Sequence, residues 1–228
     1  MSPPTLVAAR GLVKTYQRGT EAVHALSDVT VALHPGELVA LAGPSGSGKS
    51  TLLNVLCGWE HPEEGAVSYG GALASTDDPA ALAWSQLALV PQALGLLDDL
   101  TIAENVAMPA RFAHGPRAGR AEADALMSRL GIDHLARRHP RQTSLGEQQR
   151  CCVARALVLR PLVVLADEPT AHQDADWGEG IFAAMRELAH TGSAFLIATH
   201  NPETWHHADR VLSMRDGELR AGAPETIS

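Results

Sequence analysis

The sequence has few aromatic residues and no apolar run long enough to cross a membrane. Phe, Trp and Tyr together make up 4% of its 228 residues. The hydrophobic content of 45% must therefore form a core of aliphatic side chains and alanine, enough for one domain. A membrane-spanning helix needs about 20 apolar residues, and Met1–Arg10 lacks the basic and apolar regions of a secretory signal. We therefore expect a soluble chain that would serve a membrane process only through a partner.

Basic residues and cysteines are also scarce. Lys and Arg number 18 against 26 Asp and Glu, which gives a formal net charge of −8. No basic run offers the electrostatic footprint that binds nucleic acid, so no nucleic-acid partner is expected. The three cysteines, Cys57, Cys151 and Cys152, form no metal-ligand spacing. We expect reduced, buried thiols of a cytosolic protein, and the eleven histidines are scattered along the chain.

Apolar patterning predicts two kinds of strand. Leu6–Tyr16 and Val23–Leu33 alternate apolar and polar residues around Gln17–Thr20, which indicates two antiparallel strands joined by a turn. Short, almost wholly apolar runs, typical of parallel strands buried on both faces, occur at Glu37–Ala42, Leu162–Ala166 and Ala194–Thr199. Two further strands and a hairpin are expected at Gly65–Tyr69, Gln86–Val90 and Val211–Leu219.

Helices are expected between these strands. Lys49–Cys57 has the pattern of a helix that ends near Gly58, and Ala175–His190 is amphipathic. Helix-like segments dominate from about 93 to 160, among them Ala121–Leu130. We expect an α/β fold in which 1–228 form one domain, with a mixed parallel core sheet, an antiparallel β-subdomain and an inserted α-helical subdomain at about 93–160.

One contiguous motif indicates a nucleotide site. Gly43-Pro44-Ser45-Gly46-Ser47-Gly48-Lys49-Ser50 matches the P-loop pattern G-x-x-x-x-G-K-[ST] between a buried strand and a helix. Its glycines let backbone N–H groups approach phosphate oxygens closely, and the following helix adds its positive end. Lys49 is expected to neutralise the β- and γ-phosphates of ATP, Ser50 to ligate Mg²⁺ and Thr51 to donate to the α-phosphate. The fold is therefore expected to be that of a P-loop NTPase.

Two carboxylates follow the apolar strand Val163–Ala166. The strand places Asp167 at the sheet edge that carries the P-loop, where an acidic side chain holds Mg²⁺, usually through water. Glu168 is one residue further on and can polarise the attacking water. A pair of carboxylates at a strand end is weak evidence alone, but the P-loop gives this pair a function.

Further motifs, in the same order as in the ABC transporter ATPase family, show that nearly the whole chain resembles that family. The resemblance implies that Tyr16 stacks on adenine, that Gln92 of Val90-Pro91-Gln92 contacts Mg²⁺ and links the site to a membrane partner, and that His200 contacts the γ-phosphate. Thr143-Ser144-Leu145-Gly146-Glu147-Gln148-Gln149-Arg150 resembles the family's signature motif. The run from Glu168 to Asp174 resembles the segment that leads into its D-loop.

The resemblance also implies how two such chains would work together. Two ATPase subunits would pack head to tail, with each ATP between the P-loop of one and Ser144, Leu145, Gly146 and Glu147 of the other, beside Asp174. Closure on ATP and loosening after hydrolysis would drive an integral-membrane permease at the inner face of the cell membrane. The implied catalytic residues are Lys49, Gln92, Glu168 and His200. The implied Mg²⁺ ligands are Ser50, Gln92 and Asp167.

The sequence departs from the family's pattern at two motifs. In the signature, Leu145 replaces the first glycine and Thr143 the usual leucine, while Ser144 and Gly146 are retained. In the D-loop, His172-Gln173 replaces the common Asn-Leu. A leucine near phosphate adds a side chain and restricts φ. Either Leu145 points away from ATP and is tolerated, or the shared site is weakened.

Several segments resemble the branch of the family that releases lipoproteins or exports macrolides. These are Ala22–Val31, Gly43–Leu53, Leu94–Val106 and the end of the signature. They imply an exporter or a lipid-extracting system, in which the leucines after Gln92 either face the permease or fill the helical subdomain. The alternatives are an ATPase that transmits force to cell-wall hydrolases in division, a soluble ABC ATPase of DNA repair or translation, and a nucleotide-dependent regulator without turnover. The absence of coiled-coil insertions, a second ATPase half and a basic patch argues against the second.

Overall fold

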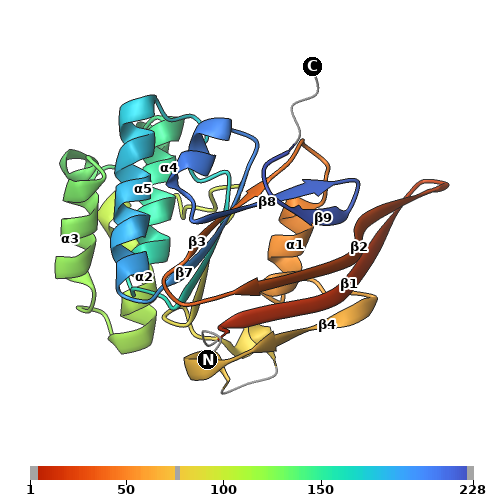
Figure 1. Ribbon diagram of the computed structural model, residues 1–228. Coiled ribbons are helices and arrows are strands. Elements are labelled where there is room, and N and C mark those ends of the chain that lie inside the picture. Colours follow the sequence, from red (N-terminus) through yellow and green to blue (C-terminus); the bar gives the residue numbers. More distant parts are fainter. Residues whose placement is uncertain (1–4, 75–77, 225–228) are drawn as a thin grey trace.

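Two β-sheets and a cluster of helices make up the computed structural model, which describes residues 5–74 and 78–224 (Figure 1). The smaller sheet is antiparallel and three-stranded, in the order β2-β1-β4. It consists of β1 (Val7–Arg18), β2 (Glu21–Leu33) and β4 (Glu64–Tyr69). The strands predicted here are confirmed, but the first turn is shorter than expected because Arg18 pairs with Glu21. The first four residues of Met1–Arg10 lie outside the described residues.

The larger sheet has six strands in the order β5-β6-β7-β3-β8-β9. All its neighbours are parallel except β8 and β9, which form an antiparallel hairpin. This is the mixed, mainly parallel sheet that the apolar runs predict. Its strands are β3 (Leu38–Ala42), β5 (Leu87–Val90), β6 (Val163–Asp167), β7 (Ala194–Thr199), β8 (Arg210–Arg215) and β9 (Glu218–Ala221).

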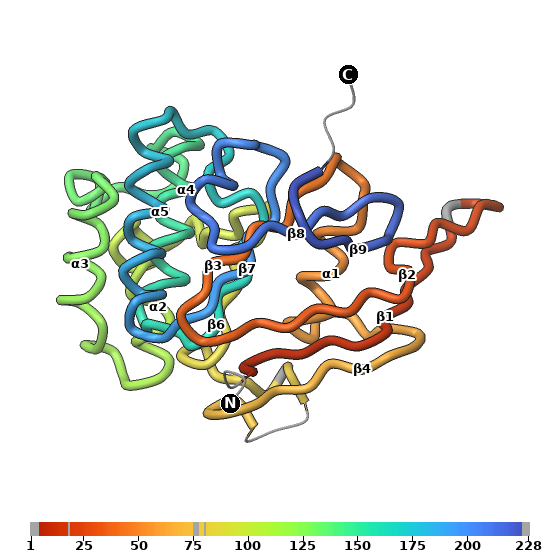
Figure 2. The backbone as a smooth tube through the Cα atoms, in the orientation of Figure 1, coloured from red at the N-terminus to blue at the C-terminus, as the bar shows by residue number. Residues whose placement is uncertain are grey.

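The helices lie on both faces of this sheet. Figure 1 shows α2–α5 on one side, and α1 between the two sheets. The trace in Figure 2 shows that α2, α3 and α4 form an excursion of the chain between β5 and β6. The α-helices are α1 (Lys49–Leu56), α2 (Ile102–His114), α3 (Arg120–Arg129), α4 (Leu145–Leu157) and α5 (Ala175–His190). Short 3₁₀ turns occur at Gly71–Leu73, Pro79–Ala81, Asp133–Leu135, Pro140–Gln142 and Pro202–His207.

Alternate residues of the central strands belong to different hydrophobic cores. Val164 and Phe195 pack with the helices α2–α5, whereas Leu165 and Leu196 pack with α1 and the antiparallel sheet. Side chains of a strand point to opposite faces in turn, so both faces of this sheet are covered. This double burial explains the apolar runs, and all three cysteines are buried and free.

The parallel register brings three strand ends to one edge. Ala42 of β3 lies opposite Thr199 of β7, and Asp167 of β6 lies opposite Ala198. The segments that begin at Gly43, Glu168 and His200 therefore leave the sheet side by side. Within residues 5–74 and 78–224, no helix has the length and apolar character needed to span a bilayer.

Gly131 offers a test of this packing. It follows α3 with φ of +65°, and a Cβ there would lie 2.0 Å from the ring of Trp177 on α5. We predict that Gly131→Ala lowers the free energy of unfolding by about 2–4 kcal/mol, from backbone strain and overpacking. The measurement is thermal or urea unfolding.

The matched control is Gly180→Ala, inside α5, where a Cβ would meet nothing within 4 Å. It should raise stability by about 0.5–1 kcal/mol, because alanine favours the helix. Equal effects of the two substitutions would contradict the proposed contact with Trp177.

Candidate functional site

The phosphate-loop segment after β3 is packed so tightly that two of its glycines have no space for a side chain. A Cβ on Gly43 would lie 2.2 Å from the carbonyl oxygen of Met214, and one on Gly48 would lie 2.1 Å from that of Ala25. Gly46 has φ of +80°, Gly48 has φ of +107°, and nothing lies within 4 Å of a Cβ built on Gly46. The loop is thus fixed against β2 and β8 and open on its other side, with Pro44 and Ser45 exposed.

Lys49 is a buried cation that binds backbone carbonyls of its own loop. Its side chain is only 7% exposed, and Nζ donates to the carbonyls of Gly43 and Pro44 at 2.8 and 2.9 Å. Burial lowers the pKa of Lys49, and the negative charges of Glu168 and Asp167 oppose that shift. The hydroxyl of Ser47 in the same loop is buried and finds no hydrogen-bond partner among the described residues. Both groups are suited to receive an anion.

Ser50 and Asp167 meet at the base of this loop. The Ser50 hydroxyl donates to Asp167 Oδ2 at 2.6 Å, although the residues are 117 positions apart. Asp167 is 7% exposed, and its burial raises the pKa of the carboxyl group. In the described ranges no group of three or more His, Cys, Asp or Glu could hold a metal ion. One carboxylate and one hydroxyl nevertheless suit Mg²⁺, which prefers oxygen ligands and keeps waters and substrate phosphates.

Glu168 and His200 form a contact at the same edge. His200 Nδ1 lies 2.6 Å from Glu168 Oε1, and the backbone N–H of His200 donates to that oxygen at 3.0 Å. The Glu168 side chain is 12% exposed, whereas that of His200 is 67% exposed. Glu168 has φ of +50°, which strains a non-glycine residue. Gln149 of α4 is 2% exposed and donates to the Glu168 carbonyl at 3.4 Å, a contact that no sequence pattern indicates.

Tyr16 lies on β1 and is tied to the segment after α1. Its phenol donates to the carboxylate of Glu60, which also accepts a 2.9 Å bond from Asn54 Nδ2. Burial and Glu60 raise the pKa of Tyr16, and a contact with Thr51 opposes them. The residue is 36% exposed, and Lys14 Nζ lies 5.6 Å from its ring centre. The structure thus connects Tyr16 to α1, the helix that follows the phosphate loop.

The other predicted site residues make separate contacts. Ser144 caps α4 through a reciprocal pair of bonds with Glu147, and this lowers the pKa of Glu147. Asp174 caps α5 by accepting from the Trp177 N–H at 3.0 Å. Gln92 is exposed just after β5. In the part of the chain that the structure describes, no hydrogen bond or ion pair joins these residues, or Leu145 and Gly146, to the phosphate loop.

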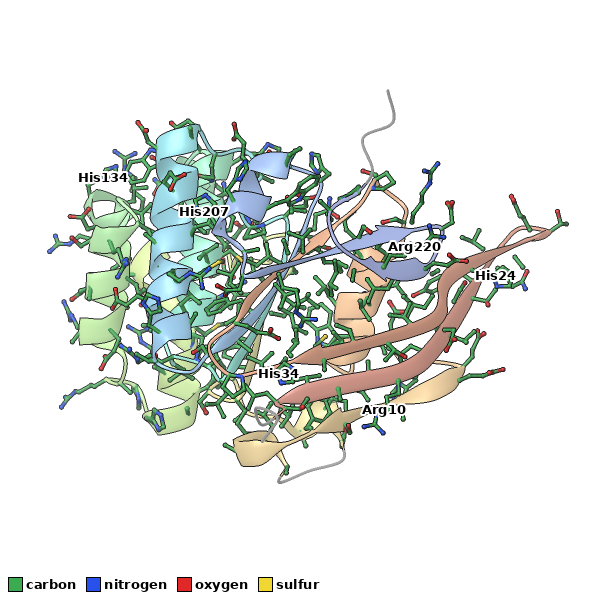
Figure 3. The ribbon with its side chains drawn as sticks, in the orientation of Figure 1. Arg10, His24, His34, His134, His207 and Arg220 are labelled. Carbon is green, nitrogen blue, oxygen red and sulfur yellow. The ribbon has the colours of Figure 1, made fainter. Side chains whose placement is uncertain are left out.

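The labelled histidines do not form a second centre. Figure 3 shows His24, His34, His134 and His207 well separated from one another. His207 stacks on Phe182 at 4.4 Å and lies 3.2 Å from Glu179. These four histidines therefore form no common site.

Comparison with known proteins shows the family to which this site belongs. The ABC transporter family model matches residues 26–171. The lipoprotein-releasing system ATP-binding protein LolD of Pseudomonas fluorescens is 41% identical over 226 residues, which cover 97% of this chain and 100% of that protein. The macrolide export ATP-binding/permease protein MacB of Photorhabdus laumondii is 36% identical over 98% of this chain but only 35% of that protein.

Solved structures agree with this assignment. A dimeric structure of the ATP-binding cassette MJ0796, in a post-hydrolysis state bound to ADP and Pi, matches with a TM-score of 0.85 and 31% identity. The match covers 95% of this chain and 98% of that one. The chain belongs to the ABC transporter family. It is an ATP-binding, ATP-hydrolysing subunit that powers a membrane transporter, and its fold is that of a P-loop ABC ATPase.

Asp167 generates a stability prediction. Because burial raises its pKa, the folded chain holds this proton more tightly than the unfolded chain does. The destabilisation caused by ionising Asp167 is therefore fully present at pH values above the pKa of the folded chain. It disappears at pH values below the pKa of the unfolded chain. We predict that Asp167→Asn, which still accepts from Ser50, stabilises the nucleotide-free protein by about 1 kcal/mol at pH ~8. The gain should shrink as the pH falls toward ~4.

Thermal unfolding across this pH range measures the effect. Asp124→Asn, at an exposed position of α3, is the matched control and should change stability by less than about 0.5 kcal/mol. A loss of stability in Asp167→Asn at the higher pH would show that the buried carboxylate is net stabilising.

Proposed function

We propose that this chain is the ATPase subunit of an ABC system that either is an exporter or extracts lipids or lipoproteins from the membrane. Support comes from the convergence of Lys49, Ser50, Asp167, Glu168 and His200 at one sheet edge. The lipoprotein-releasing relative is 41% identical over 97% of this chain, and the macrolide exporter is 36% identical over 98% of it. In this proposal 1–228 act as one ATPase domain, with a helical subdomain at about 93–160.

The first wall of the proposed site binds the phosphates. Backbone N–H groups of Gly43–Ser50 surround them, Lys49 exchanges its two carbonyl contacts for phosphate oxygens, and Thr51 donates to the α-phosphate. Burial makes this exchange favourable, because a desolvated ammonium group gains from an anion. Tyr16 stacks on the adenine through its exposed ring surface.

Ser50, Asp167 and Gln92 would hold Mg²⁺. The Ser50–Asp167 pair supports this assignment, because a carboxylate with a raised pKa, next to a hydroxyl, gains from a divalent cation. The ion would neutralise charge on the phosphates during hydrolysis. Gln92 is exposed after β5 and can reach outward from the sheet edge.

Glu168 and His200 act on the water. We assign Glu168 as the carboxylate that orients and polarises the attacking water, with His200 contacting the γ-phosphate. Their 2.6 Å contact supports a shared function, because each side chain fixes the other's position before nucleotide binds. Glu168 is held in a strained conformation at this point, as functional residues often are.

A second subunit supplies the other wall. Ser144 caps α4, and Leu145, Gly146 and Glu147 form its first turn, where N–H groups without an intrahelical carbonyl partner favour an anion. Leu145 is 49% exposed on that turn, so its side chain is available to a neighbouring subunit. We propose a head-to-tail dimer in which this turn and Asp174 complete the site for the other subunit's ATP.

A permease completes the complex. Of the leucines after Gln92, Leu94 and Leu96 pack on the helical core, whereas Leu97 is 47% exposed. Asn105 of α2 is fully buried and binds the backbone of Leu97 in both directions, so it fixes this loop. We propose that the loop faces an integral-membrane permease and that the chain lies at the cytoplasmic face of the membrane. Co-purification of the chain with its membrane partner in detergent tests this proposal. A partner that regulates cell-wall hydrolases would favour the division function instead.

The catalytic assignment predicts a trapped state. Glu168→Gln should bind ATP but hydrolyse it about 10²–10⁴-fold more slowly, because the water loses its carboxylate. With saturating ATP and Mg²⁺ it should accumulate as a dimer, measured by size-exclusion chromatography with light scattering. Unaltered protein without its permease should hydrolyse ATP slowly and stay mainly monomeric.

Lys49→Ala in the Glu168→Gln protein is the control. It removes the phosphate-binding cation and should abolish dimer formation at the same ATP concentration. A Glu168→Gln protein that remains monomeric at saturating ATP and Mg²⁺ would rule out the homodimer.

A further inference from the structure

Gln173 joins the segment before α5 to the first turn of α4 within one chain. Its side-chain Nε2 donates to the carbonyl of Gly146 at 2.9 Å, and its Oε1 accepts from Arg150 Nη1 at 2.8 Å. The Gln173 amide therefore uses both its donor and its acceptor. The donor binds the backbone of the turn, and the acceptor binds Arg150, one helical turn further along α4. A leucine, common at this position in the family that the sequence resembles, could form neither bond.

The close approach of the segment before α5 to the first turn of α4 depends on Gly146. A Cβ on Gly146 would lie 2.9 Å from the carbonyl oxygen of His172 and 3.3 Å from Gln173 Nε2. Gly146 does not have a positive φ, so its small size, and not its backbone freedom, is what the contact needs. His172 in turn has φ of +62°, which lets the chain turn against α4.

Arg150 gives the amide a fixed orientation. The residue is 7% exposed, and its guanidinium lies 4.2 Å from the ring centre of Trp177 on α5. A buried, stacked guanidinium has little freedom, so it holds Gln173 Oε1 in place and directs Nε2 at Gly146. The link therefore connects α4, α5 and the segment between them as one unit.

Leu145 explains why this turn needs to be held. It is the first residue of α4, and its side chain is 49% exposed beside the N–H groups of the turn. Glycine at this position would let a phosphate group approach from several directions, but a leucine side chain blocks some of them. The orientation of the turn therefore affects how a phosphate group can reach its N–H groups.

We propose that Gln173 is a positioning residue that holds the first turn of α4 in the orientation that Leu145 requires. Two of the departures from the family pattern, Leu145 and Gln173, thus act as a pair. The inference rests on the proposed function, in which this turn completes the ATP site of a second subunit. It adds that the geometry of that wall is set from within the chain, by a side chain that touches no nucleotide.

A double-mutant cycle in the Glu168→Gln protein tests the pair. The variants are Gln173→Leu, Leu145→Gly and the two together, and the readout is the Mg-ATP concentration at half-maximal dimer formation. Gln173→Leu should raise this concentration about tenfold, from loss of the bond to Gly146. With Leu145→Gly present, the same substitution should change it less than about twofold.

A second variant separates positioning from stability. Gln173→Glu still accepts from Arg150 but cannot donate to the Gly146 carbonyl. It should keep the melting temperature of the parent yet weaken dimer formation about tenfold. Ala121→Glu, an exposed site on α3, controls for the added charge and should behave as the parent. ATP affinity of the dilute monomer should be unchanged in every variant, because Lys49 and its loop are untouched.

The outcomes distinguish the two proposals. A parent that does not dimerise with ATP overturns the proposed function and this inference with it. A parent that dimerises, with Gln173→Leu and Gln173→Glu within about twofold of it, overturns the inference alone. Equal effects of Gln173→Leu with and without Leu145→Gly would also overturn it, because the two residues would then act independently. If the Gln173→Leu protein does not fold, the dimer formation of the Gln173→Glu variant decides whether the inference holds.

Discussion

The register of the parallel sheet is the constraint on which the site depends. Pairing of Ala42 with Thr199, and of Asp167 with Ala198, places the ends of β3, β6 and β7 level with one another. A slip of one residue would move every side chain of a strand to the opposite face. Since alternate residues of these strands fill two different cores, such a slip would be very unfavourable. Burial of apolar side chains thus fixes the positions of polar ones.

The polar groups at that edge carry costs in the nucleotide-free fold. Lys49 and Asp167 are desolvated, and Glu168 has a positive φ. Each of these groups has a contact that a ligand can replace. Lys49 binds backbone carbonyls, Asp167 binds a hydroxyl, and Glu168 contacts a histidine. A fold that stores these costs has something to gain from a ligand that is both anionic and metal-bound.

Sequence patterns predicted most of this arrangement, for reasons that differ by element. The phosphate loop is contiguous, so its glycines, Lys49 and Ser50 are recognised without any fold. The central strands are recognised because burial on both faces leaves an apolar run. The first hairpin was predicted with too long a turn, because strand ends depend on pairing between strands and not on local composition. No local pattern assigns a function to Gln149, since nothing in its sequence neighbours indicates that it faces the backbone of Glu168.

The class of fold, the Gly43–Ser50 loop, the acidic end of β6 and the two unusual motifs can be read from the sequence alone, because each depends on neighbouring residues or on a hydrophobic period. Which distant residues meet is known only from the folded chain: Ser50 binds Asp167, Glu168 contacts His200, and Gln173 binds Gly146 and Arg150. The strand order β5-β6-β7-β3-β8-β9 is not the chain order. Hydrophobic periodicity indicates which face of a strand is buried but not which strand lies beside it. Contacts between segments that are distant in the sequence therefore follow from packing alone.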